Sequence, residues 1–248
     1  MNKIWIISRK DISDAFRSRS TYVFLLVMLV LTFIYISIYT GTVNSDPYKN
    51  NPSLIADYSH KYINTLAYLF PLMFSNFICS IFANYAVIVD KAKRNIESLM
   101  ATPVSIKQIW MGKSLAVTVP SVGMGIGISV ISYLVLDIGF VMPNTHSFIY
   151  PGIIPVISAL IIMPALLFVI VAIVTYIQLT ITNPRIGNFV FSGVFILLMI
   201  GGETLLAENY STNYLALVYL GVIAICAVIA YILSFSLTKE RVLLSSKV

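Results

Sequence analysis

Long stretches of this chain contain no charged residue, and that feature limits the possible folds more than any other. The runs without Asp, Glu, Lys or Arg are 20–45, 62–89, 114–136, 138–184, 186–202 and 209–238. A helix needs about 20 apolar residues to cross the hydrocarbon core of a bilayer, and these runs do not alternate as barrel strands do. Only 10% of the residues are charged, too few to cover a soluble domain. The sequence therefore predicts an all-α integral membrane protein.

We expect six transmembrane helices in one domain over residues 1–248. They are predicted at Thr21–Thr42, Ile63–Val89, Leu115–Leu136, Gly152–Gln178, Asn188–Leu206 and Tyr214–Ser236. The run 138–184 is too long for one helix, and its first part, MPNTHSFIYPG, has the composition of a loop. The fifth span is short and glycine-rich. Two interpretations therefore stay open for residues 188–213, a plain span or a short helix followed by a re-entrant piece.

The basic residues predict the orientation. Fourteen of the 16 Lys and Arg residues fall on one side of this topology, and only Lys49 and Lys61 fall on the other. Basic residues accumulate in cytoplasmic loops. We therefore expect a multi-pass protein of the cell membrane with both termini in the cytoplasm. The topology also accounts for the net charge of +6, so nucleic acid is not an expected partner.

The first 19 residues predict an amphipathic elbow helix. On a helical wheel, Met1, Trp5, Ile12 and Phe16 share one face, and basic residues lie on the opposite one. Such a helix lies at the membrane surface before the chain turns into the first span. Two roles stay open, a basic anchor that only sets the topology and an elbow that packs against neighbouring spans.

Residues 90–114 form the longest predicted cytoplasmic loop. A short helical pattern ends near Ala101, because a residue that precedes proline disfavours helical geometry. Ser105 with Gln108 then matches a capping box, which predicts that a new helix starts there and continues into the third span. Apolar residues at the tip of this projection predict a partner, either lipid or a protein groove. The alternative is a surface helix that merely joins two spans.

These residues carry a resemblance to a known family. The stretch NIESLMATPVS, residues 95–105, with Ile109 and Gly112-Lys113 after it, resembles the cytoplasmic loop of ABC-2-type transporter permeases. That loop follows a pattern close to G-T-L/I-E-x-L-L-x-[ST]-P-[VI]-S. The N-terminal stretch from Trp5 to Ile12 resembles the common start of these permeases. One departure is Arg94-Asn95, where the family has G-T.

The resemblance implies a membrane subunit of an ATP-binding-cassette transporter. It would act as a homodimer or as a heterodimer with a similar permease, above two cytoplasmic ATPase subunits. Residues 95–101 would form the coupling helix in the ATPase groove. Gly112-Lys113 would mark the entry to the third span, with Lys113 reaching toward the lipid headgroups. The coupling set that the resemblance implies is Ile96, Glu97, Ser98, Leu99, Met100, Thr102, Pro103, Val104, Ser105 and Gln108. ATP and Mg²⁺ would sit on the partner ATPase, so no cofactor is expected in this chain.

The other polar and small residues offer weaker signals. Gly123 and Gly127 form a G-x-x-x-G pair that favours close helix packing, within the subunit or across a dimer. Asn76 and Asn84 lie on roughly one face of the second span, where they would either bond to other helices or line a path. Gly112-Lys113-Ser114 lacks the first glycine of a Walker A motif, because Lys107 stands there. We find no catalytic motif and no Cys/His cluster for a metal, so an enzyme is not expected.

Three functions are compatible with these observations. The first is an export permease powered by a separate ATPase. The second is a non-transporting membrane scaffold or immunity protein, for which the loop at 90–114 would be a docking site only. A secondary transporter is the third, and it is disfavoured because such proteins need an ionisable group in mid-membrane, which the predicted spans lack.

Overall fold

The computed structural model describes residues 3–45, 48, 51–183, 186–187, 189–193, 196–197, 200 and 212–245. Every regular element in these ranges is a helix. In chain order they are α1 (Lys3–Phe16), α2 (Arg19–Val43), α3 (Pro52–Ala83), η1 (Asn84–Val89), α4 (Asp90–Ala92), α5 (Asn95–Met100), α6 (Ile106–Leu136), η2 (Asp137–Val141), α7 (Met142–Thr145), α8 (Ile153–Ile157), η3 (Ser158–Ile162), α9 (Met163–Thr180), α11 (Thr212–Ser236) and α12 (Lys239–Ser245). The predicted all-α class of a membrane protein agrees with this inventory.

Five helical stretches of the described chain are long and apolar enough to cross a membrane. They are Thr21–Val43, Pro52–Ala92, Ile106–Thr145, Ile153–Thr180 and Tyr214–Ser236. The last coincides with its prediction, and the second and third are far longer than predicted. The predicted loop before the second span is helical from Pro52, because proline at the first helical position follows an extended Asn51. The predicted fifth span, Asn188–Leu206, lies mostly outside the described residues.

Three of these stretches contain a π-helical segment. η1, η2 and η3 begin at the polar residues Asn84, Asp137 and Ser158, respectively. A π segment inserts an extra residue in a turn and shifts the hydrogen bonds of the helix, and such bulges often lie at functional sites. η1 lies directly before α4 and α5, so the shifted turn precedes the predicted coupling loop.

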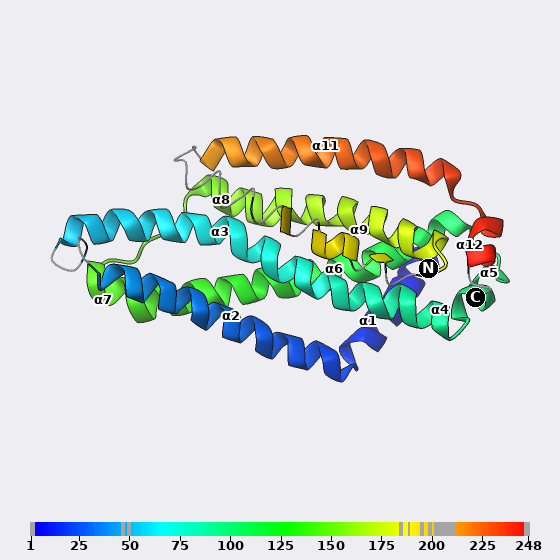
Figure 1. The fold of residues 1–248 in the computed structure, drawn as a ribbon, viewed down its shortest axis with the longest axis horizontal. Helices are drawn as coiled ribbons and strands as arrows, with labels where there is room; N and C mark the ends of the chain where they lie inside the picture. The colour runs from blue at the N-terminus through cyan, green and yellow to red at the C-terminus, as the bar shows by residue number, and fades with distance from the viewer. Residues whose placement is uncertain are drawn as a thin grey trace.

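The elements gather at two ends of the bundle. α1, α4, α5 and α12 lie at one end, and α7, the start of α3 and the start of α11 lie at the other (Figure 1). α9 finishes at the α5 end, whereas α11 begins at the α7 end (Figure 1). α9 and α11 therefore run through the bundle in the same direction (Figure 1).

The centre of the bundle is formed by α3, α6 and α9. α3 packs most extensively against α6, and α6 also packs against α1 and α9. The α3–α6 approach is closest at Gly125, where an added Cβ would lie 2.6 Å from the backbone nitrogen of Ser75. α2 and α11 lie at the edges of the bundle (Figure 1). Most of their large apolar side chains are exposed, as lipid-facing helices require.

Tyrosines hold the α7 end together. Tyr39 of α2 hydrogen-bonds to Ser59 of α3 at 2.7 Å, and the hydroxyl of Tyr62 donates to the carbonyl oxygen of Tyr35 at 2.8 Å. Tyr133 of α6 likewise donates to the carbonyl oxygen of Ile149 in the following loop at 2.8 Å. At the α7 end, hydrogen bonds of tyrosine hydroxyls therefore connect the elements, and the described chain forms no ion pair there.

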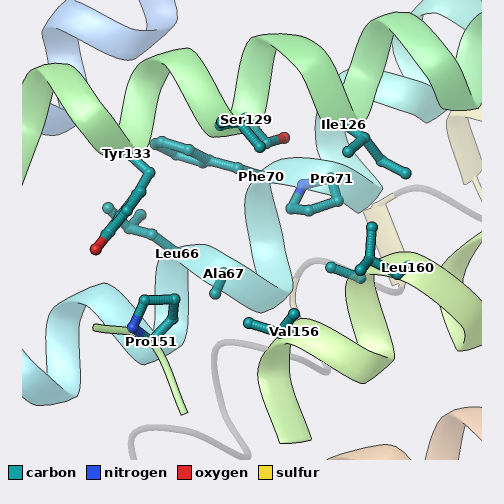
Figure 2. Close-up of a pocket in the computed structure, with 12 residues that line it drawn as sticks. Leu66, Ala67, Phe70, Pro71, Ile126, Ser129, Tyr133, Pro151, Val156 and Leu160 are labelled. Carbon is teal, nitrogen blue, oxygen red and sulfur yellow. The ribbon is translucent and has the colours of Figure 1, made fainter. Parts of the chain in front are cut away.

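A proline in α3 opens a cavity near this end. Pro71 lacks an amide hydrogen, so the helix loses one hydrogen bond and bends there. Beside the break lies an apolar cavity of about 640 Å³ between α3, α6 and the α8–η3 segment. Phe70, Ile126 and Leu160 point toward it from the three sides (Figure 2). No charged side chain lines this cavity among the described residues.

Candidate functional site at the α5 end

A buried charge cluster next to the start of α5 joins α1, the η1–α4 segment and α6. The ammonium nitrogen of Lys113 lies 2.6 Å from Oδ2 of Asp90 and 3.2 Å from Oδ2 of Asp11. It also donates a hydrogen bond to the carbonyl oxygen of Ala86 in η1. Asn95, the first residue of α5, donates from its amide to Oδ1 of Asp90 at 2.9 Å. The cluster therefore links α1, the η1–α4 segment and α6 to the start of α5.

The charges of this cluster depend on one another. The side chain of Lys113 is 0% exposed, and both carboxylates are buried. Burial raises the pKa of the Asp11 carboxyl, whereas the Lys113 ammonium lowers it and so opposes burial. A buried ion left without its partner destabilises a fold by about 3–5 kcal/mol. Lys113 is thus required to keep two carboxylates in the interior.

The N-terminal helix packs through its small and polar face. Ser8 donates a hydrogen bond to the carbonyl oxygen of Gly112 at 2.7 Å. An added Cβ at Gly112 would lie 3.2 Å from the side chain of Ile7, so glycine lets α1 approach α6 closely. Ala15, on the same face as Asp11, is fully buried. α1 is therefore an integral part of the bundle, and it is more than a basic anchor.

This packing corrects one expectation from the sequence and refines another. A lysine at the end of an apolar run reads as one that reaches toward the lipid headgroups, but Lys113 points into the protein and pairs with acids. The apolar face predicted for the first helix contacts the bundle only in part, through Phe16, whose ring lies edge-to-face against Phe82 of α3 with the centroids 5.4 Å apart. Trp5 and Phe16 stay exposed, at 51% and 40%, on a surface suited to lipid.

The loop after α4 has the predicted caps. The backbone amide of Gln108 donates to Oγ of Ser105 at 3.2 Å, and the backbone amide of Ser105 donates to Oε1 of Gln108 at 3.1 Å. This reciprocal pair is the predicted capping box, and it starts α6 at Ile106. α5 ends at Met100, close to the predicted end at Ala101, and the hydroxyl of Thr102 caps the carbonyl oxygen of Leu99 at 2.5 Å.

The predicted coupling residues divide into two groups by exposure. Ile96 and Met100 are 0% and 7% exposed and belong to the chain's own core, against which Leu99 and Val104 also pack. Their burial gives these residues a role in fixing α5 to the bundle. The exposed positions are Ser98, Thr102, Pro103 and Ser105, with Glu97 and Gln108 half-buried. Contact of either group with an ATPase stays a prediction.

Arg94 adopts an unusual backbone conformation at the start of α5. Its φ is 56°, in the left-handed region, and it occupies the N-cap position of the helix. This region favours glycine, because a Cβ there crowds the carbonyl oxygen. The family pattern has glycine at this position, so the same turn fits both sequences. Arginine in place of glycine therefore raises the free energy of this left-handed turn.

The C-terminal helix completes the site, and the sequence did not indicate this. Lys239 of α12 donates to the carbonyl oxygen of Met100 at 3.2 Å, and Ser245 donates to the carbonyl oxygen of Leu179 at 2.8 Å. Lys91 in turn donates to the carbonyl oxygens of Gln178 and Ile181, at 3.0 and 2.6 Å, where α9 ends. Lysines at the C-terminal end of a helix satisfy its last carbonyls and its dipole. The apolar residues Val242 and Leu243, in a mostly polar tail, were the signal in the sequence that could have indicated this helix.

The remaining predicted positions lie away from this cluster. Gly123 and Gly127 are exposed, and an added Cβ at either would meet nothing within 4 Å. Among the described residues nothing packs closely on these two glycines, whereas Gly125 contacts α3, and packing across a dimer stays a prediction. Asn76 is buried in α3 and Asn84 is half-buried at the start of η1. A path along them also stays a prediction.

Comparison with known proteins adds no family to this picture. No protein-family model matches the chain, and no curated protein is similar to it. The argument for function therefore depends on the local geometry and on the sequence motif.

Proposed function

We propose that this chain is the membrane subunit of an ABC-2-type ATP-binding-cassette transporter that exports its substrate. Two such subunits, identical or similar, form the transport pathway across the cell membrane. Two separate ATPase subunits dock in the cytoplasm at the α5 end and carry ATP and Mg²⁺. The proposal rests first on the resemblance of residues 95–113 to the coupling loop of these permeases. It rests second on the topology predicted from the sequence, which has six spans and both termini in the cytoplasm.

The geometry of α5 is the observation that supports this function best. α5 is a helix of six residues that is tied to the bundle by Ile96 and Met100, while Ser98 and the Thr102-Pro103 turn face outward. A loop that only joins two spans needs neither a rigid short helix nor a capping box after it. A rigid projection with an exposed tip suits a partner that pushes on it.

In this proposal, the buried charge cluster transmits a displacement of α5 to the membrane-spanning helices. Asn95 at the start of α5 bonds to Asp90, and Lys113 links Asp90 to α6 and α1. Lys239 holds the carbonyl oxygen of Met100 at the other end of α5. In the proposed mechanism, ATP closes the ATPase dimer and displaces α5, and the charged contacts carry α1, α3 and α6 along. Breaking any of these buried pairs is costly, so the elements move together.

Co-purification with an ATPase tests this function. The full chain is purified from its native membrane, and ATPase activity and the identity of bound proteins are measured. We expect a protein with Walker motifs in the eluate, and we expect Ser98→Arg and Thr102→Arg to remove both the bound ATPase and its activity. Both positions are exposed, and their hydroxyls make only local hydrogen bonds, to Asn95 and Leu99, so we expect both variants to fold, which their thermal unfolding verifies. Leu99 is a poorer choice because it packs against the core.

A matched control is available at the opposite end of the molecule. Ser53→Arg places the same side chain on an exposed position near the start of α3 and should leave the ATPase bound. An eluate without any ATPase, or full ATPase coupling in both α5 variants, would reject the proposal. A bound ATPase whose activity does not drive ATP-dependent flux in sealed vesicles would identify a scaffold instead.

A further inference from the structure

Helices α6, α9 and α11 enclose an apolar groove that the proposed transport function does not use. The groove has a volume of about 820 Å³. It is lined by three helices, mainly through Trp110 and Met111, Phe168 and Ala172, and Ala227 and Tyr231. α11 lies at the edge of the bundle (Figure 1), and the groove residues Ala227 and Tyr231 of α11 are exposed. We therefore expect the groove to face the surrounding bilayer. In that medium an apolar groove is filled by hydrocarbon.

One cation lies at the end of this groove. Lys107 lines it, and its ammonium nitrogen is 5.3 Å from the ring centroid of Phe235 in the last turn of α11. The apolar span of α11 ends at Ser236, so Lys107 is level with the edge of the membrane. Lys107 is exposed and has no ion pair among the described residues. Its charge is therefore available to an anion at the depth of the lipid headgroups.

We infer that this groove binds an anionic phospholipid from the leaflet on the Lys107 side. One acyl chain lies between α6, α9 and α11, and the phosphate of the headgroup contacts the Lys107 ammonium. The cavity of Figure 2 makes a useful contrast. Apolar residues line that cavity too, but no charged side chain does, so it has no means of selecting a headgroup. The inference does not depend on the proposed transport function.

Trp110 makes this site measurable. Its indole nitrogen donates to the carbonyl oxygen of Ala172 at 2.8 Å, and the side chain is 7% exposed, so the ring is fixed in the wall of the groove. The chain contains only two tryptophans, and the other is Trp5 on the exposed face of α1. A Trp5→Phe background therefore leaves Trp110 as the only indole signal. A bromine atom on a bound acyl chain quenches that signal by contact.

The experiment uses the full chain with Trp5→Phe in phosphatidylcholine bilayers. Brominated phosphatidylglycerol or brominated phosphatidylcholine is added at matched mole fractions, and Trp110 quenching is recorded. A basic residue near an anionic membrane surface contributes about a fivefold preference for anionic lipid. We expect brominated phosphatidylglycerol to reach half-maximal quenching at about one fifth of the mole fraction that brominated phosphatidylcholine needs. Lys107→Gln should remove this difference.

Two control variants, Lys93→Gln and Val228→Phe, separate effects at the site from general effects. Lys93→Gln removes one exposed positive charge at the same end of the bundle but outside the groove, and it should keep the fivefold preference. Ala227→Phe fills the groove and should weaken quenching by both lipids. Val228→Phe, on a neighbouring exposed position that does not line the groove, should leave quenching unchanged.

Three results would overturn the inference. They are equal quenching by the two lipids in the parent protein, an equal loss of preference in the Lys93→Gln and Lys107→Gln variants, and an absence of quenching by either lipid. The last result would mean that another chain covers Trp110. Thermal unfolding of each variant verifies that the fold is kept, so a change in quenching reports on lipid contact.

Discussion

The two ends of the bundle fasten the same helices by different chemistry. At the α5 end, ammonium groups of Lys113, Lys91 and Lys239 bind carboxylates and backbone carbonyls. At the α7 end, hydroxyl groups of Tyr39 and Tyr133 do the equivalent work, and the described chain forms no ion pair there. Both arrangements join separate elements of the bundle through hydrogen bonds, but only the first is ionic.

This difference has a physical origin and a consequence. The distribution of basic residues predicts that the α5 end faces the cytoplasm, where lysine and arginine accumulate. With that orientation, few basic donors are available at the other end, and neutral hydroxyls take their place. A neutral hydroxyl contributes about 1 kcal/mol to stability, whereas loss of one member of a buried ionic cluster costs several times more. A single substitution in the ionic cluster should therefore destabilise the whole α5 end. At the α7 end, each substitution should remove only the stability of one hydrogen bond.

Lys113→Met should have the largest effect. It leaves Asp11 and Asp90 buried without their cation and should lower the free energy of unfolding by about 3–5 kcal/mol. For a chain of this size the melting temperature should fall by about 10 °C. Thermal unfolding of the purified protein in detergent measures the change.

Neutralising the acids should reverse much of that loss. The triple variant Lys113→Met, Asp11→Asn, Asp90→Asn contains no unpaired ion and should regain more than half of the lost melting temperature. Lys107→Met, on the exposed first turn of the same helix, should change it by about 1 °C at most. If Lys113→Met melts within about 2 °C of the parent, the cluster does not hold this end together.

Between the two ends, the contact of α3 with α6 depends on a missing side chain. Gly125→Ala places a Cβ 2.6 Å from the backbone nitrogen of Ser75, so a helix must shift. Such overpacking should cost about 1–3 kcal/mol. Gly123→Ala and Gly127→Ala point into open space and should be neutral or slightly stabilising, because alanine is the better helix former. Equal melting temperatures for the three variants would contradict the closest approach at Gly125.

At the α7 end, Tyr39→Phe should cost only about 1 kcal/mol. Tyr39 donates to Ser59, which still donates to the carbonyl oxygen of Ile55 when the tyrosine hydroxyl is absent. Combining Tyr39→Phe with Ser59→Ala in a double-mutant cycle should give a coupling energy of about 0.5–1.5 kcal/mol. A loss as large as that of Lys113→Met would remove the distinction between the two ends.

Local patterns in the sequence predicted these elements better than contacts between distant residues. The apolar helix at Tyr214–Ser236 and the capping box of Ser105 with Gln108 depend on neighbours in the chain, and the structure contains both. The burial of Lys113 depends on Asp11, 102 residues away in sequence, and no local pattern encodes that pairing. A lysine that ends an apolar run has the same appearance whether it reaches headgroups or a buried acid.

The same limit explains the glycines and the C-terminal helix. A G-x-x-x-G spacing identifies one face of α6, but the face that meets α3 carries Gly125, and only the packing of the two helices selects it. Docking of α12 depends on Met100 and Leu179, which are 139 and 66 residues from their partners. Proline at the first helical position indicated a helix start at Pro52. The prediction missed this start because it relied on runs without charged residues, and the first turns of α3 are polar.

The smallest expected effect is a gain at the α5 end. Arg94 has a φ of 56°, a conformation that costs a residue with a Cβ about 1–2 kcal/mol and costs glycine little. Glycine also gains freedom in the unfolded chain, which offsets part of this benefit. Arg94→Gly should therefore raise the free energy of unfolding by roughly 0.5–1 kcal/mol. Arg94→Ala removes the same charge but keeps the Cβ, so it should give no gain. If both variants stabilise the protein equally, the charge of Arg94 is responsible and the turn is not. If only Arg94→Gly stabilises it, the backbone at Arg94 is strained in the native protein, and the buried charge cluster at the same end offsets the cost of that strain.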